Sequence, residues 1–328
     1  MSDATTTWPC AALERAPLAD LTNMRVGGSA EWLLEPADPD ELRDAIGAAR
    51  ERGFTPRILG GGANLVVADG VLPGVVIGTS RMNKVMRPQA ADHAAGEALD
   101  QAPDARIAPT PIEEDPRLVC WAGAGMPGLV SRMRRLGLTG LEMLAGVPGH
   151  IGGGVAMNAG GRGWEVWNSV ELVRLVEPDG TFRDLPREEA SPTYRNGNLG
   201  EAVVAGVVLR FEVAPKPLVD ERVKGYMRAK NATQPVTAAS AGCVFKNPDP
   251  ERSGGMTAGQ LVDACGLKGR RIGGAEVSER HANFIVNAGG ATATDVLGLM
   301  DLVRTEVAEQ RGVELAFEVK RWLAEPEG

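Results

Sequence analysis

Two glycine-rich segments constrain this chain more than any other feature. The first covers residues 60–64 and is flanked by two short β-branched runs, and the second extends over residues 140–160. Glycine lets the backbone approach a bulky anion and turn its N–H groups toward it, which larger residues would block. One such loop also suits any tight turn. Two long ones, each with an asparagine near its end, indicate a dinucleotide pyrophosphate held between two lobes.

The composition supports this interpretation. The chain has 328 residues, enough for two or three domains, and 43% of them are hydrophobic, enough for real cores. Its 42 glycines are well above the usual share of about 7%, and many of them lie in the two loops. The net charge of -8 argues against nucleic acid as a partner, so an anionic ligand would need basic residues nearby.

Cysteines and histidines give no sign of a metal site or a disulfide framework, because they are few, widely spaced and form no C-x-x-C pair. The N-terminus lacks the basic and apolar regions of a signal peptide, and no run of about eighteen apolar residues occurs. We therefore expect a cytoplasmic protein that does not enter a membrane. The residues concerned are Cys10, Cys120, Cys243, Cys265, His93, His150 and His281.

The pattern of the chain predicts three lobes. The first covers residues 18–80, with residues 313–325 returning to it; the second covers 81–215 and the third 216–312. Residues 1–20 read as a loosely ordered lead-in. Residues 86–117, rich in Ala, Pro, Asp and Glu, read as a surface insertion or mobile loop without a catalytic role.

Local signals predict individual elements within these lobes. Asp38 can cap a helix that has Pro39 in its first turn and ends near Gly53. The segment 177–180 is a hairpin turn signal. Further helices are expected at 127–136, at 219–230 and from Thr292 onward, and strands at 31–36, 57–59, 65–67, 75–77, 118–122, 170–176, 202–213 and 313–319.

The first glycine loop argues against a Rossmann fold, because a strand and not a helix follows it, so no helix N-terminus can receive the phosphate there. Strand, glycine loop, strand resembles the other flavin fold, in which two α/β subdomains clamp an extended FAD. We therefore expect an α+β protein. It would combine an FAD-binding clamp like that of vanillyl-alcohol oxidase (the PCMH type) with a third, α+β substrate domain.

A series of motifs in order along residues 20–322 resembles the UDP-N-acetylenolpyruvoylglucosamine reductase (MurB) family of peptidoglycan synthesis. Each motif alone is weak, and their joint order is specific. They are Asn23 to Gly28, Gly60 to Asn64, Gly140 to Gly160, Tyr194-Arg195, Thr233-Gln234-Pro235, Ala241 to Pro248, His281 to Asn287 and Phe317-Glu318-Val319.

The resemblance implies a two-stage redox reaction with non-covalent FAD and with NADPH as hydride donor. Reduced FAD would pass hydride to C3 of the enolpyruvyl ether of UDP-N-acetylglucosamine, and a protein acid would protonate C2 to give UDP-N-acetylmuramate. The implied partners are this small-molecule substrate and NADPH, with neither nucleic acid nor membrane. We expect a monomer.

The resemblance places catalysis on Cys243, Arg195 and Glu318. Cys243 stands where the family usually has the serine that donates the C2 proton. A free thiol, with a pKa of about 8.5, is a better acid than a hydroxyl and is mostly neutral at pH 7. Arg195 would neutralise the enolate-like charge beside the substrate carboxylate, and Glu318 would hydrogen-bond that carboxylate. The plainer alternatives are that Cys243 is an inert buried thiol, that Arg195 forms a surface ion pair, and that Glu318 faces outward from a strand.

The binding residues follow from the same motifs. For FAD they are Gly60, Gly61, Gly62, Ala63, Asn64, Leu65, Gly146, Pro148, Gly149, His150, Gly152, Gly153, Asn158, Ala159 and Gly160. For the substrate they are Tyr194, Arg228, Lys230, Gln234 and Asn247. Asn64 and Asn158 either bond the pyrophosphate or close their own turns. Arg228 and Lys230 either bind phosphate or form a solvated basic face.

Some positions depart from the family pattern and keep alternatives open. Ala63 replaces a small hydroxyl residue, and His150 replaces a threonine. Between Arg195 and Cys243 no loop carries a tyrosine over the substrate, so the chain resembles the branch of the family without that loop. Tyr226, in an expected helix, is a poor substitute. Two other functions remain: a flavin oxidase of the same fold with covalent flavin on His150, and a binding protein without turnover.

Overall fold

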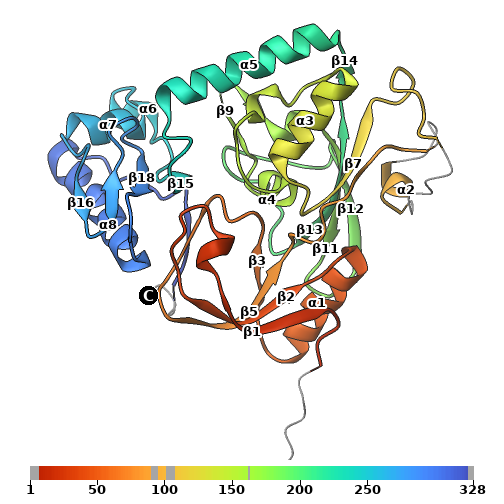
Figure 1. The fold of residues 1–328 in the computed structure, drawn as a ribbon, viewed down its shortest axis with the longest axis horizontal. Helices are drawn as coiled ribbons and strands as arrows, with labels where there is room; N and C mark the ends of the chain where they lie inside the picture. Colours follow the sequence, from red (N-terminus) through yellow and green to blue (C-terminus); the bar gives the residue numbers. More distant parts are fainter. Residues whose placement is uncertain (1–6, 90–94, 101–107, 162, 324–328) are drawn as a thin grey trace, which may run out of the picture. The chain divides into compact units, whose positions relative to one another are not determined.

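The computed structural model describes residues 7–89, 95–100, 108–161 and 163–323 (Figure 1). These residues form two compact units. The first comprises Met1–Leu13, Trp32–Gly61 and Gly74–Met227, and the second Glu14–Glu31, Gly62–Pro73 and Arg228–Gly328. Among the described residues, no helix is long and apolar enough to cross a membrane.

The N-terminal part of the chain forms a four-stranded sheet of order β1-β2-β5-β3. β3 and β5 pair in parallel. The elements in this part of the chain are β1 (Ala11–Pro17), η1 (Ala19–Leu21), β2 (Ser29–Glu35), α1 (Pro39–Glu51), β3 (Arg57–Leu59), β4 (Leu65–Val67) and β5 (Val71–Gly78). The expected strands are confirmed here, whereas β1 shows that the loosely ordered lead-in was wrong for residues 11–17.

The helix predicted after Asp38 is confirmed as α1. The Asp38 carboxylate accepts a hydrogen bond from the backbone N–H of Glu41 at 2.9 Å, and Pro39 occupies the first turn. The Glu41 side chain accepts from the N–H of Ala37 at 2.8 Å. Leu42, Ala45, Ile46 and Ala49 lie on its buried face, which is the spacing expected of an amphipathic helix.

The first unit is built on a five-stranded sheet of order β12-β11-β13-β7-β6, antiparallel throughout. The hairpin turn predicted at 177–180 is confirmed, since it joins β11 to β12. The elements of this region are β6 (Val85–Met86), α2 (Ala95–Asp100), β7 (Arg117–Trp121), α3 (Met126–Leu136), β8 (Leu138–Thr139), η2 (Glu142–Leu144), α4 (Ile151–Ala156), β9 (Gly160–Gly161), β10 (Trp164–Glu165), η3 (Val166–Asn168), β11 (Val170–Val176), β12 (Phe182–Pro186), β13 (Val203–Arg210), β14 (Glu212–Val213) and α5 (Lys216–Thr233).

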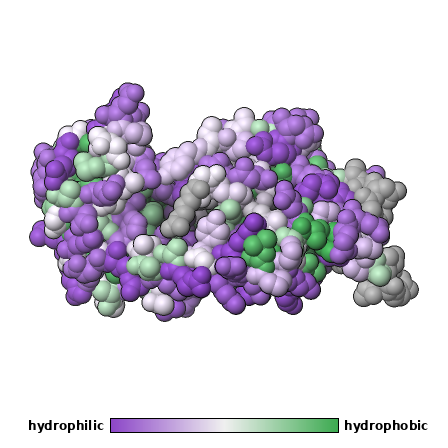
Figure 2. Space-filling model, turned by 90° about the horizontal axis from the view of Figure 1, so that it is seen from above, coloured by the Kyte–Doolittle hydropathy of each residue, from purple (hydrophilic) through white to green (hydrophobic). Residues whose placement is uncertain are grey.

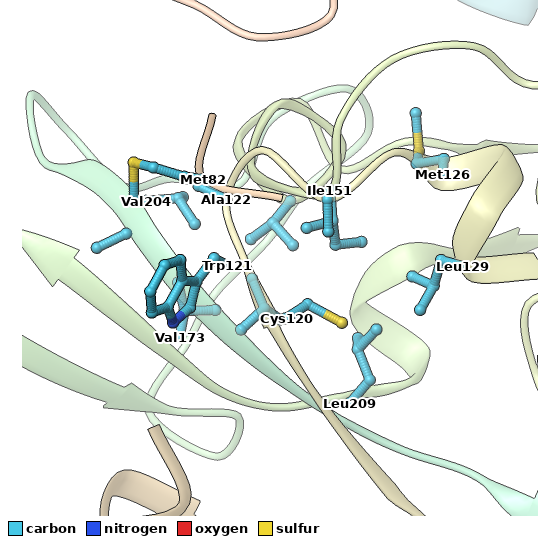
Figure 3. Close-up of a cluster of buried hydrophobic side chains, with 14 of the residues drawn as sticks. Met82, Cys120, Trp121, Ala122, Met126, Leu129, Ile151, Val173, Val204 and Leu209 are labelled. Carbon is cyan, nitrogen blue, oxygen red and sulfur yellow. The ribbon is translucent and has the colours of Figure 1, made fainter. Parts of the chain in front are cut away.

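Alternation along the strands gives this sheet two apolar faces. Cys120, Val173 and Leu209 contribute to the large core that also includes Leu129 of α3 and Ile151 of α4, and Figure 3 shows these side chains close together. Their neighbours Val119, Leu172 and Val208 point to the other face, where Ala98 and Leu99 of α2 cover them. Complete burial raises the pKa of the Cys120 thiol to about 12.

This second face corrects the expectation for residues 86–117. Residues 95–100 form a helix whose apolar side chains complete a core, so they are not a surface loop. Gly206 of β13 fits the same contact, because a Cβ there would lie 2.6 Å from Cδ2 of Leu99. Residues 90–94 and 101–107 of the expected insertion lie outside the described residues.

A buried ion pair lies at the C-terminal end of residues 86–117. The Arg117 guanidinium donates to both carboxylate oxygens of Asp115 at 2.8 Å, with side-chain exposures of 3% and 2%. Burial acts to raise the pKa of Asp115, but the hydrogen bonds and charge of Arg117 outweigh it and hold that pKa below its usual range. The pair therefore stabilises the fold above the unfolded-state pKa of about 3.9. That contribution is lost as the pH falls through the lower, folded-state pKa.

We expect Asp115→Ala to lower the free energy of unfolding by about 3–5 kcal/mol at neutral pH, because a buried guanidinium loses its main partner. Urea denaturation followed by circular dichroism measures it. Asp263→Ala is the matched control, since it removes an exposed ion pair with Lys268 and should cost less than about 1 kcal/mol. Equal losses in the two variants would contradict the role given to Asp115.

The second unit has its own core and its own sheet, of order β15-β18-β17-β16. α8 packs on this sheet (Figure 1), and Thr292 begins it as predicted, in a capping box with Asp295. The elements are β15 (Ser240–Cys243), α6 (Pro250–Ser253), α7 (Ala258–Ala264), β16 (Arg271–Ile272), β17 (Ala275–Val277), β18 (Phe284–Asn287), α8 (Ala293–Arg311) and β19 (Lys320–Trp322).

The end of the described chain corrects another prediction. The strand expected at 313–319 is wrong: the strand is β19, and it pairs in parallel with β4. Residues 313–319 instead follow an irregular path, with Val313, Leu315 and Val319 buried in the core of the second unit.

The face of the protein drawn in Figure 2 is mostly hydrophilic, with small separate hydrophobic areas.

Candidate functional site

Cys243 ends β15 in the second unit, opposite Phe284 of β18. The pairing of these strands shifts register between Ser240 and Cys243, and Gly242 has a φ of 81°, which a side chain would strain. The Cys243 side chain is half-buried, and Val244 and Phe245 after it are buried. The thiol therefore lies at an irregular strand end, where the backbone can fix the orientation of the Cys243 side chain and leave it partly exposed.

The segment that carries Glu318 lies directly beside this strand end. The N–H of Glu318 donates to the carbonyl of Val244 at 2.8 Å, and the N–H of Lys246 donates to Ala316 at 2.8 Å. Between these bonds the rings of Phe245 and Phe317 stack, with centroids 5.3 Å apart. The second unit thus brings together Cys243 and Glu318, two of the three residues expected to carry catalysis.

Arg195 belongs to the first unit and lies at the tip of a tight turn. Thr193 and Asn196 exchange backbone hydrogen bonds at 2.8 and 3.0 Å, which leaves Tyr194 and Arg195 between them. Arg195 has a φ of 57°, an uncommon conformation for a residue with a side chain. Its guanidinium lies 5.0 Å from the ring centroid of Tyr194, which is itself 48% exposed.

Asn158 connects this turn to the second glycine-rich segment. It is fully buried, and its amide nitrogen donates to the carbonyl of Thr193 at 2.9 Å and to the carboxylate of Glu165 at 2.7 Å. Both of its N–H groups are thereby used, which favours the second of the two alternatives, that Asn158 closes local structure. Its Oδ1 is buried without a hydrogen-bond partner, and as an acceptor it suits a hydroxyl or imide N–H but not a phosphate.

The two glycine-rich loops meet within the first unit. A Cβ on Gly61 would lie 2.7 Å from Cα of Gly149, so a larger residue at position 61 would force the loops to move. His150 lies beside them, where its Nδ1 is 3.3 Å from the Thr79 hydroxyl and where burial lowers its pKa. The lowered pKa favours the uncharged imidazole beside the two glycine loops at neutral pH.

The second loop continues into a short helix that the sequence did not reveal. α4 follows His150, although half of its residues are glycine, which disfavours helix. Gly152 is fixed by packing: its N–H donates to the carbonyl of Ala122 at 2.9 Å, and a Cβ there would lie 2.8 Å from Cβ of Ala122. Gly153 is exposed, and a Cβ there would meet nothing within 4 Å.

The remaining residues expected to bind FAD are divided between the units. Gly60, Gly146, Pro148, Ala159 and Gly160 belong to the first unit, whereas Gly62, Ala63, Asn64 and Leu65 belong to the second. The Asn64 amide donates to the carbonyl of Glu318 at 3.0 Å, and its own carbonyl accepts from the N–H of Lys320. Asn64 therefore ties the first loop to the Glu318 segment.

The residues expected to bind substrate are spread over several elements. Arg228 and Lys230 lie near the end of α5, with Gln234 just beyond it. Tyr226 is in the same helix, as expected. The Asn247 side chain accepts from the N–H of Ala258 at 3.1 Å, at the start of α7.

Comparison with known proteins decides the family. Residues 30–104 and 109–186 match an FAD binding domain, and residues 234–322 match the C-terminal domain of UDP-N-acetylenolpyruvoylglucosamine reductase. A protein of that name from Synechococcus sp. (strain WH7803) is 37% identical over 319 residues, which cover 95% of this chain and 94% of the relative. The chain belongs to the UDP-N-acetylenolpyruvoylglucosamine reductase family.

Other relatives agree with this assignment. A reductase of the same name from Myxococcus xanthus is 39% identical, over 95% of this chain and 92% of the relative. The crystal structure of the Thermus caldophilus enzyme matches with a TM-score of 0.73 at 33% identity, covering 95% of this chain and 98% of that one. Family membership, the α+β flavin fold distinct from a Rossmann fold, and FAD as cofactor are thus confirmed.

A single added methyl group tests the loop contact. We expect Gly61→Ala to weaken FAD binding about tenfold or more, because forcing atoms into a packed contact costs about 1–3 kcal/mol and here would move the loops apart. Titration of FAD fluorescence measures the affinity. Gly128→Ala in α3 is the control, since its added Cβ meets nothing within 4 Å. Wild-type FAD affinity in Gly61→Ala would contradict the role given to the contact.

Proposed function

We propose that this chain reduces UDP-N-acetylglucosamine enolpyruvate to UDP-N-acetylmuramate at the expense of NADPH, as a cytoplasmic monomer in peptidoglycan precursor synthesis. The observation that carries the proposal is the hydrogen bond from the N–H of Glu318 to the carbonyl of Val244. It fixes a carboxyl group and the thiol of Cys243 on adjoining segments, in a chain whose family is named for this reaction.

The glycine loops fit the cofactor. Their closest approach, at Gly61 and Gly149, presents backbone where the FAD-binding match lies, and the buried, unpartnered Oδ1 of Asn158 offers a polar group in the same region. Backbone N–H groups of Gly60, Gly61, Gly149 and Gly153 would hold the pyrophosphate. FAD held there would supply hydride chemistry, carrying the hydride of NADPH to C3 of the enolpyruvyl ether.

Cys243 provides the other half of the reduction. The thiol proton goes to C2 while C3 gains the hydride, so the methylene becomes a methyl group and the enol ether becomes a lactyl ether. The resulting thiolate then regains a proton from solvent. Half-burial suits this task, because the side chain is close to water for reprotonation yet lies at a fixed strand end.

Arg195 and Glu318 would stabilise the charge that develops beside the reacting carbon. Adding hydride at C3 places negative charge on C2 and the neighbouring carboxylate, and a guanidinium can neutralise it through two parallel hydrogen bonds. The left-handed backbone of Arg195 and the cross-turn bonds that hold it support an aimed side chain over a surface ion pair. Glu318 would hydrogen-bond the same carboxylate.

The substrate's uridine diphosphate would be held by Arg228, Lys230 and Asn247, and Tyr194 and Gln234 would contact the rest of the substrate. The three polar residues suit a diphosphate because they offer two cations and an amide donor in a protein whose net charge is -8.

The test is NADPH oxidation by the FAD-loaded protein, measured with and without the enolpyruvyl substrate. We expect consumption only when that substrate is present, with one lactyl ether formed per NADPH. Flavin that stays attached to the protein after acid precipitation would support an oxidase with covalently bound flavin instead. Bound FAD without substrate-dependent turnover would leave only a binding function.

A further inference from the structure

Asn283 is a buried residue that the reaction described above does not use. It lies just before β18, is 3% exposed, and its side-chain amide makes two hydrogen bonds to the backbone of a single residue, Phe245. Its Nδ2 donates to the carbonyl of Phe245 at 2.8 Å, and its Oδ1 accepts from the N–H of Phe245 at 2.9 Å. Its backbone carbonyl accepts from the N–H of Val244 at 2.8 Å.

These three bonds hold the two residues that directly follow Cys243. The ladder between β15 and β18 shifts register before Cys243, so regular strand pairing does not continue past it. The amide of Asn283 takes the place of the missing strand neighbour, with one donor and one acceptor in the same geometry. Phe245 is 1% exposed, so both of its backbone groups would lack a partner without Asn283.

We propose that Asn283 is the positioning residue for Cys243: its amide fixes the backbone beyond the thiol and so aims the proton donor. The proposal rests on the proposed function, in which Cys243 protonates the substrate. A misplacement of about 1 Å can cost about a hundredfold in rate, so a residue that sets the backbone at this point controls turnover without touching substrate.

Asn287, the last residue of β18, provides a control at the other end of that strand. It too is an asparagine whose side chain bonds backbone groups: it donates to Met24 at 3.3 Å and accepts from Gly289 at 3.0 Å and Ala291 at 3.2 Å. None of these groups belongs to the Cys243 segment. Asn287→Leu therefore measures what the loss of side-chain bonds to the backbone does in this sheet away from Cys243.

The test compares Asn283→Leu, Asn283→Asp and Asn287→Leu by three measurements. The first is the rate of iodoacetamide alkylation at Cys243 in the FAD-free protein, assigned by peptide mass spectrometry. The second is the rate at which NADPH reduces the bound flavin, which needs no proton donor at C2. The third is kcat and KM with the enolpyruvyl substrate.

We expect Asn283→Leu to lower kcat by about 10- to 100-fold with little change in KM, to change the Cys243 alkylation rate at least about threefold, and to leave flavin reduction within about twofold of wild type. Asn287→Leu should keep all three values near wild type. Asn283→Asp offers both bonds only when its carboxyl is protonated, so its kcat should approach wild type at low pH and fall as the pH rises.

Besides Cys243 itself, the ionisable groups near this segment include His281, whose Nδ1 accepts from the N–H of Asn283 at 3.2 Å, and Lys246, Lys268 and Glu318. All are shared by the wild type and Asn283→Asp, so a pH dependence found only in the variant is due to residue 283.

Unchanged alkylation and kcat in Asn283→Leu would overturn the proposal, as would a loss of flavin reduction equal to the loss of kcat. If the wild type itself lacks enolpyruvyl-dependent turnover, the proposed function fails, while altered alkylation in Asn283→Leu alone still supports control of the thiol by Asn283.

Discussion

Cys243→Ala is expected to lose about a hundredfold to ten-thousandfold in turnover of the enolpyruvyl substrate, because a positioned general acid contributes about that much. Reduction of the bound flavin by NADPH should stay within about twofold of wild type, because that stage needs no proton at C2. Stopped-flow absorbance separates the two stages. Loss confined to the second stage identifies the thiol as the acid for the substrate.

Two further variants make this result specific. Cys243→Ser should keep turnover within about tenfold of wild type, since a hydroxyl can donate the same proton from nearly the same place. Cys265→Ala is the control, because Cys265 is likewise a half-buried cysteine of the second unit, and the reaction does not use it. Full turnover in Cys243→Ala would show that another group supplies the proton.

Arg195→Ala is expected to lower kcat by about a hundredfold to a thousandfold, because one fixed donor to a developing negative charge is worth about that much. Arg195→Lys should recover only part of the loss, since an ammonium group cannot form the paired hydrogen bonds of a guanidinium. Steady-state kinetics with the enolpyruvyl substrate measure both. Arg183→Ala removes an exposed arginine paired with Glu177 and should leave kcat unchanged. A change in KM alone for Arg195→Ala would contradict a role in stabilising charge during the reaction.

Local signals in the sequence were sufficient to predict those caps and turns that depend on interactions between neighbouring residues. The cap at Asp38, the capping box at Thr292 and the turn at 177–180 depend on neighbouring residues, and each is found where it was predicted. The order of motifs likewise sufficed for the family and for FAD, because those motifs are read without knowing how they fold.

Long-range packing determined what the sequence did not reveal. Residues 95–100 have only one large apolar side chain, Leu99, and their helix is stabilised by its packing with Ala98 on the sheet face at Val119 and Leu172. α4 forms despite its glycines because the N–H groups of Ile151 and Gly152 bond the carbonyls of Ala124 and Ala122. Residues 313–319 alternate like a strand, yet their hydrogen bonds to Val244, Lys246 and Asn64 are isolated ones and form no regular ladder among the described residues.

The candidate site also combines residues that the sequence predicted with residues whose roles depend on long-range packing. Cys243 and Glu318 were expected to act together, and the structure places their segments side by side through hydrogen bonds between residues far apart in sequence. The roles of Asn158 and Asn283 depend on which buried backbone groups lack a neighbour, a property that appears only in the folded chain. The only signal in the sequence was their place inside the two motifs that also contain Met157 and His281.

The most direct test of the central claim starts from enzyme whose bound flavin has been reduced with NADPH and freed of excess nucleotide under anaerobic conditions. Mixing it with UDP-N-acetylglucosamine enolpyruvate in D₂O should reoxidise the flavin in a single turnover and give a lactyl ether with deuterium at C2. UDP-N-acetylglucosamine without the enolpyruvyl group should leave the flavin reduced. A flavin that stays reduced with the enolpyruvyl substrate would contradict the account.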